Sequence, residues 1–79
     1  MSTSAVRIDP LVVDVSCSDV SLCIVLADGR EIVTPLEWFP RLRDASPSQR
    51  ANWQPIGGGI GIHWPDVDED LSIAGLLAS

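Results

Sequence analysis

The side chains with the clearest chemical potential lie together near the end of the chain. Asp66, Asp68 and Asp70 alternate, Glu69 stands among them, and His63 comes shortly before. Alternating carboxylates are the first three ligands of a calcium loop, which also needs a glycine at its sixth position and a bidentate glutamate at its twelfth. Leucines occupy both of those positions here. We therefore predict a solvated acidic cluster that binds no calcium.

Other catalytic or metal-binding interpretations fail for lack of partners. Zinc sites draw three or four nitrogen or sulfur ligands, and His63 is the single histidine of the chain, so we predict that it makes a structural hydrogen bond. A serine or cysteine nucleophile needs a base, and nothing in the sequence places His63 beside Cys17 or Cys23. The glycines at 57–59 lack the Gly-Lys-Ser/Thr ending of a phosphate loop, and the chain has no lysine. We predict a protein that is not an enzyme and has no metal or cofactor.

The three tryptophans carry most of the aromatic surface of the chain. In so small a core at least two of Trp38, Trp53 and Trp64 are expected to be structural. A partly exposed tryptophan flanked by charge is instead typical of a binding anchor, because tryptophan is enriched at interface hot spots. Trp64 adjoins the acidic cluster, and we predict that it is this anchor.

The elements that position these side chains begin with a β-meander. Residues 11–18 and 20–27 are rich in β-branched side chains, Asp28-Gly29 is a tight-turn signal, and 31–34 continues as a third strand. Cys17 and Cys23 fall on neighbouring strands, where we expect small core hydrophobes, with a disulfide as the alternative.

The second half of the chain predicts short helices and one more strand. Pro35 opens a short helix that Pro40 limits, and Ser46-Pro47 is a serine cap followed by proline at the first helical position. The glycine triplet is expected to lead into a last strand that ends near Trp64 and pairs with the meander. Residues 71–77 suit a terminal helix, with Asp68 to Asp70 in its early turns. We predict one α+β domain over residues 1–79, a small antiparallel sheet of three to four strands packed with short helices.

Charge and composition limit the classes of molecule that this protein is expected to bind. The formal net charge is -6, from five arginines against 11 acidic residues, which disfavours direct contact with nucleic acid. An acidic protein can nevertheless occupy a basic groove on a partner that normally holds nucleic acid, and the alternative is that the charge only maintains solubility. The first residues carry no signal-peptide pattern, and no stretch approaches the roughly 20 apolar residues of a membrane span. We expect no membrane contact and a cytoplasmic location.

Five sequence blocks, in a fixed order, carry a resemblance to a known family. The chain resembles Domain of Unknown Function 2442 in Pro35-Leu36-Glu37-Trp38-Phe39-Pro40-Arg41-Leu42, in residues 45–53, in Gly61-Ile62-His63-Trp64-Pro65, in Asp68-Glu69-Asp70 and in Gly75-Leu76-Leu77. The resemblance implies a small bacterial or phage-borne protein, often encoded beside another small protein in what resembles a toxin and antitoxin pair. It implies an interaction module with no agreed catalytic residues.

From charge and resemblance together we expect a small acidic, non-enzymatic inhibitor or interaction protein that blocks a basic nucleic-acid-binding surface, as DNA-mimicking anti-CRISPR proteins do. The partner would be a protein with a basic groove in a bacterial host, for example a CRISPR effector subunit or a small toxin, and the protein a monomer or weak dimer. The alternative is an antitoxin-like protein that neutralises a small toxin. The predicted partner-binding residues are Trp64, Asp66, Asp68, Glu69 and Asp70, with Asp28, Glu31 and Glu37 on the sheet side, where Asp14 and Asp19 add charge.

Overall fold

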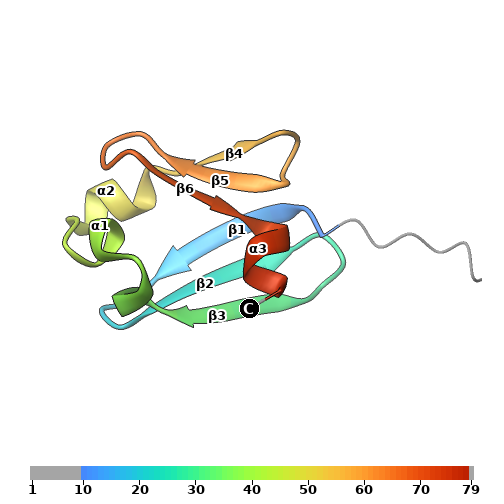
Figure 1. Cartoon of the computed structure of the whole chain (residues 1–79), viewed down its shortest axis with the longest axis horizontal. Helices are drawn as coiled ribbons and strands as arrows, with labels where there is room; N and C mark the ends of the chain where they lie inside the picture. The colour runs from blue at the N-terminus through green and yellow to red at the C-terminus, as the bar shows by residue number, and fades with distance from the viewer. Residues whose placement is uncertain (1–9, 79) are drawn as a thin grey trace, which may run out of the picture.

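Two three-stranded antiparallel sheets and a few short helices make up the computed structural model, which describes residues 10–78 (Figure 1). The elements in chain order are β1 (Val12–Cys17), β2 (Ser21–Leu26), β3 (Glu31–Pro35), the 3-10 helix η2 (Leu36–Trp38), α1 (Pro40–Arg43), α2 (Pro47–Ala51), β4 (Gln54–Ile56), β5 (Gly61–Trp64), β6 (Glu69–Ser72) and α3 (Ile73–Leu77). The α+β class predicted from the sequence is confirmed, although the strands form two sheets rather than one.

The first sheet is the predicted meander, in the order β1-β2-β3. Its second turn follows the Asp-Gly signal: Gly29 has a φ of 92°, which glycine adopts without strain, and the Asp28 carboxylate accepts a hydrogen bond from the Arg30 backbone N–H at 3.0 Å. Local residues therefore determine this turn.

The two faces of the first sheet differ sharply. Leu22, Ile24 and Leu26 alternate along β2 onto one face and are fully buried. Cys17 pairs with Leu22 and so lies toward that face, whereas Cys23 lies on the opposite, open face. Both thiols are free. The prediction of a core position is confirmed in part for Cys17, which is half-buried and packs against the core, and is wrong for Cys23.

The second sheet, ordered β4-β5-β6, corrects two expectations. The strand that ends at Trp64 pairs with β4 and β6 and not with the meander. The strand β4 has no sequence signal, because its three residues are exposed and one is Pro55. Residues 69–72, expected as the start of a helix, form β6, because Asp68 adopts a left-handed φ of 54° that reverses the chain. The final helix begins only at Ile73, where Ser72 is the N-cap.

The short helices keep the start signals read from the sequence. The Ser46 side chain accepts from the Gln49 N–H at 3.2 Å while the Gln49 side chain accepts from the Ser46 N–H at 2.9 Å, a complete capping box with Pro47 at the first position. Pro40 does not merely limit one helix. It begins α1 after the separate turn η2, since proline is tolerated where no backbone donor is needed.

The core lies between the two sheets and beneath the helices. Ten buried apolar side chains form it: Val12, Val15, Leu22, Ile24, Leu26, Leu36, Leu42, Ile62, Trp64 and Ile73. Trp64 is 0% exposed, and its indole Nε1 donates to the Arg50 carbonyl oxygen at 3.1 Å. The prediction of an exposed anchor at Trp64 is therefore wrong, because Ile62 and Trp64 share the face of β5 that packs against the core.

The β4–β5 turn links the second sheet to the first at one close approach. The Val12 N–H donates to the Gly59 carbonyl oxygen at 2.9 Å. Gly59 has a φ of 112°, and a Cβ there would lie 3.0 Å from the Leu11 Cβ and 3.2 Å from the Val12 nitrogen. Glycine is required at this point both for its backbone conformation and for its missing side chain.

The buried indole of Trp64 is expected to be a main source of stability. Trp64→Ala should lower the free energy of unfolding by about 3–5 kcal/mol, since it removes a large core side chain and leaves a cavity. Trp38→Ala, at a position 61% exposed, should change it by no more than about 0.5 kcal/mol. Urea unfolding of both variants measures the difference, and equal losses would contradict the assignment of Trp64 to the core.

Two neighbouring glycines, Gly58 and Gly59, allow a matched pair of substitutions that tests the close approach of the β4–β5 turn to β1. Gly58 has a φ of 74° and open space where a Cβ would lie, so Gly58→Ala should cost about 1–2 kcal/mol of backbone strain. Gly59→Ala adds a collision with the start of β1 and should cost about 3 kcal/mol or more. Thermal or urea unfolding compares them, and a Gly59→Ala variant as stable as Gly58→Ala would show that the sheets are not held at this contact.

Candidate functional site

The predicted acidic residues divide between two ends of the molecule. Glu31 pairs with Val25, whereas Pro35 pairs with Ser21, so β3 carries the chain about 13 Å away from Glu31 before η2 begins. Asp28 and Glu31 therefore lie at one end, called here the hairpin end, and Glu37 lies near the other. The eight predicted partner-binding residues do not form one surface.

The second end, called here the helix end, comprises the β1–β2 turn (18–20), η2, α1, α2 and the β5–β6 turn (65–68) (Figure 1). Arg41 donates to the Asp68 carbonyl oxygen at 2.5 Å, and the Asn52 side chain donates to the Asp66 carboxylate at 3.0 Å. These contacts bring the acidic turn against the helices. The expectation from the sequence groups Glu37 with Asp28 and Glu31 on the sheet side, but η2, which carries Glu37, lies at the same end of the molecule as the acidic turn (Figure 1).

Three carboxylates contact basic side chains. Asp28 pairs with Arg30 at 2.8 Å, and Asp44 pairs with Arg43 at 3.0 Å. The Arg30 backbone N–H, helped by the guanidinium, lowers the pKa of Asp28, and the hydrogen bond from Arg43 lowers the pKa of Asp44. Asp70 accepts from His63 directly across the β5–β6 ladder. The structural hydrogen bond predicted for His63 is thereby confirmed.

All four arginines of residues 10–78 are engaged within the chain. Arg30 and Arg43 hold neighbouring aspartates, and Arg41 holds the backbone of the acidic turn. Arg50 donates from Nε to the Leu42 carbonyl oxygen at 2.8 Å and from Nη2 to the Arg43 carbonyl oxygen at 2.7 Å. These two carbonyls end α1, so Arg50 caps that helix and ties it to α2.

The carboxylates are not used in the same way. Ten acidic residues lie within 10–78, and after the three contacts above seven remain without a basic partner in that part of the chain: Asp14, Asp19, Glu31, Glu37, Asp66, Asp68 and Glu69. Six of them are exposed and Glu69 is half-buried. The charge left available at the described surface is therefore predominantly negative.

The helix end also exposes apolar side chains. Trp38 is 61% exposed and Val20 is 70% exposed. Successive residues of a 3-10 turn point about 120° apart, so burying Leu36 turns Glu37 and Trp38 outward. We predicted from the sequence that Trp64 is the exposed tryptophan beside a charge. In the structure this tryptophan is Trp38. The sequence alone does not reveal it, because both tryptophans have a charged residue within two positions and only packing decides which one is buried.

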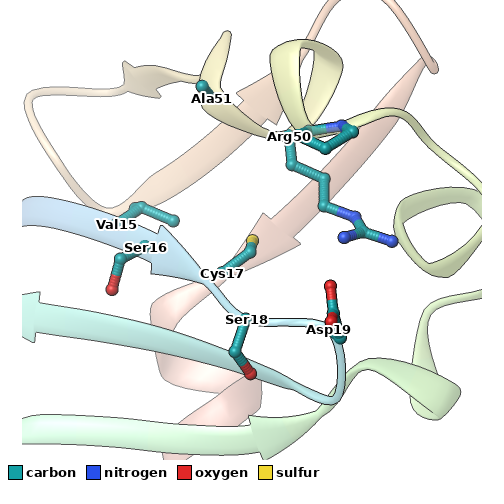
Figure 2. A pocket seen from close by; sticks show the side chains of 8 residues that line it. Val15, Ser16, Cys17, Ser18, Asp19, Arg50 and Ala51 are labelled. Carbon is teal, nitrogen blue, oxygen red and sulfur yellow. The ribbon is translucent and has the colours of Figure 1, made fainter.

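Two clefts flank the β1–β2 turn and share Asp19. One has a volume of about 330 Å³, lies between β1 and α2, and is lined by Val15, Ser16, Cys17, Ser18, Asp19, Pro47, Arg50 and Ala51 (Figure 2). The other, of about 320 Å³, is lined by Asp19, Val20, Pro35, Leu36, Glu37 and Arg43. Burial raises the pKa of the Cys17 thiol against the opposing effect of Arg50, which disfavours the reactive thiolate form.

A metal-ligating cluster and a membrane-spanning helix are both absent from residues 10–78. No group of three or more His, Cys, Asp or Glu side chains is arranged to hold a metal ion in this part of the chain. None of the helices described there is long and apolar enough to cross a membrane.

Comparisons with known proteins give a family and a solved structure. The crystal structure of a protein of unknown function from Rhodospirillum rubrum ATCC 11170 is similar to this chain, with 29% sequence identity and a TM-score of 0.73 over 89% of this chain and 87% of that one. A search of curated proteins found no match. The family model described as Protein of unknown function (DUF2442) matches residues 12–79, which include the sequence blocks noted above. The chain therefore belongs to the DUF2442 family.

Proposed function

We propose that this protein is a small non-enzymatic inhibitor or interaction protein whose acidic helix end binds a basic surface of a partner protein. One observation carries the proposal: the described arginines are all engaged internally, while seven described carboxylates have no basic partner. A surface of carboxylates without basic partners binds most favourably to a partner surface that supplies cations, because complementary charge speeds the encounter and excludes anionic competitors.

The helix end suits this role better than the hairpin end. It combines the unpaired carboxylates of Asp19, Glu37, Asp66 and Asp68 with the exposed indole of Trp38. Interfaces draw their affinity from a few large side chains that lose water on binding, while outlying charges mainly steer association. Trp38 thus takes the anchoring role that the sequence suggested for Trp64.

Basic protein surfaces that accept a polyanion are commonly those that hold nucleic acid. We propose that the partner is such a protein in the cytoplasm of a bacterial host, and that the carboxylates occupy positions otherwise taken by phosphates. Inhibition by occlusion, as in DNA-mimicking anti-CRISPR proteins, needs no bond-making chemistry. The raised pKa of the Cys17 thiol and the structural hydrogen bond of His63 support a binding role over a catalytic one.

A second candidate function is neutralisation of a small cognate protein, in the manner of an antitoxin. The open face of the first sheet favours it: Val33 is 65% exposed there, and Val13 at the β1 irregularity is exposed as well. A partner seated on that face would be held mainly by apolar contact. Such a contact depends little on ionic strength, which distinguishes it from charge-driven binding.

Salt and charge neutralisation test the proposed function. The immobilised protein is exposed to a lysate of the bacterial host, captured proteins are eluted by salt steps from about 0.05 to 0.5 M and identified by mass spectrometry. A partner held by the acidic surface should elute in these steps and compete with duplex DNA for binding. The variant Glu37→Gln/Asp66→Asn/Asp68→Asn should lose most of the captured partner.

The hairpin end supplies the matched control. Asp28→Asn/Glu31→Gln removes two charges far from the helix end and should retain the partner, while circular dichroism establishes that both variants are folded. A partner that stays bound at the highest salt and is indifferent to the helix-end substitutions would refute charge-driven binding. Loss of that partner on Val33→Asp substitution would then support the antitoxin-like function.

A further inference from the structure

We propose that the two clefts around the β1–β2 turn form one groove that binds an extended segment of the partner protein, with a basic side chain of that segment placed between Asp19 and Glu37. The inference rests on the proposed function and specifies where and how a cationic partner is held. The occupant is a peptide segment with an arginine or lysine followed by a small apolar residue.

Hydrogen bonds hold the turn that carries Asp19. The Ser18 hydroxyl accepts from the Val20 N–H at 3.2 Å and from the Ser21 N–H at 3.0 Å. The Leu36 N–H donates to the Val20 carbonyl oxygen at 3.0 Å, which ties this turn to η2. As a result Asp19 projects where the two clefts meet, and Glu37 lines the second of them. A carboxylate held on a fixed turn loses little freedom when it binds a cation.

The charges around the groove favour a cationic side chain. Asp19 and Glu37 form no ion pair within residues 10–78. The Arg43 guanidinium is paired with Asp44, and the charge of Glu37 adds only a lesser contribution to the raised pKa of Arg43. Arg50 is bound to the carbonyls that end α1. The second cleft therefore presents two available carboxylates and one guanidinium whose charge is already compensated. The second cleft therefore disfavours phosphate and carboxylate ligands.

The groove also fits the apolar parts of such a segment. Val20, Pro35 and Leu36 line the second cleft below the carboxylates, where the aliphatic stem of an arginine or lysine packs while its charged head reaches Asp19 or Glu37. On the other side of Asp19, the first cleft combines the apolar side chains of Val15, Cys17 and Ala51 with the Arg50 guanidinium, so it suits a small uncharged side chain (Figure 2). Each cleft is large enough for one or two side chains, and together they fit an extended peptide.

Titration with a short peptide tests this groove directly. The full chain, labelled with nitrogen-15, is titrated with the acetylated and amidated pentapeptide Ala-Val-Arg-Val-Ala and with the same peptide carrying neutral citrulline in place of arginine. The arginine peptide should shift the amide signals of Asp19, Val20 and Glu37. Its dissociation constant should rise about fivefold or more with citrulline, and likewise in Asp19→Asn/Glu37→Gln, because two charge pairs are lost.

The control variant Asp28→Asn/Glu31→Gln should bind the arginine peptide as the unaltered protein does. Four results would each contradict the proposed groove. They are equal binding of both peptides, signal shifts confined to the hairpin end, no binding of the arginine peptide, and no effect of Asp19→Asn/Glu37→Gln on its dissociation constant. If the arginine peptide does not bind while capture of a host protein remains sensitive to salt and to the helix-end substitutions, the proposal of a peptide-binding groove is wrong and the proposed function stands. If capture is insensitive to both, the proposed function itself fails.

Discussion

The arrangement of the helix end depends on how the buried indole of Trp64 is held. Its Nε1 donates to the Arg50 carbonyl oxygen, which places the end of α2 over the core. From that position the Arg50 guanidinium reaches the Leu42 and Arg43 carbonyls that end α1. One buried side chain thus determines, through a single intermediary, where two short helices lie. Helices of four and five residues have little stability of their own, so these tertiary contacts are what maintain them.

This way of holding the helices also decides the charge that the surface offers. An arginine that caps a helix or pairs with a neighbouring aspartate has donors already occupied within the chain, so fewer of them are free for an external ligand. The described arginines serve the fold, and the unpaired acids are left to face solvent. Arg41 and Arg50 keep their positive charge, because the carbonyl oxygens that they contact are neutral, so the net value of -6 still describes the overall charge. The described groups without a charged partner in the chain are nevertheless mainly carboxylates. The internal contacts of the arginines stabilise the fold, and the exposed carboxylates are the groups that the proposed binding role uses.

Membership of the DUF2442 family and the likeness to the Rhodospirillum rubrum protein establish the fold and leave the activity open. A fold can host many functions, so function has to be argued from the surface. On this chain the argument favours the helix end, where Trp38, Asp19 and Glu37 combine apolar area with available charge. The hairpin end has comparable acids, but its Asp28 is already paired with Arg30.

Local signals were enough to predict several elements. The Asp28-Gly29 turn and the Ser46-Pro47 cap are determined by residues that contact each other within a few positions, and the meander follows from its β-branched runs. The burial of Trp64, the second sheet and the strand at 69–72 were missed, because each depends on contacts between segments distant in sequence. By itself the sequence determined the family, the α+β class and the surplus of acid. Only the tertiary structure decided which tryptophan is buried and which carboxylates stand together, because exposure and proximity are properties of the packed chain.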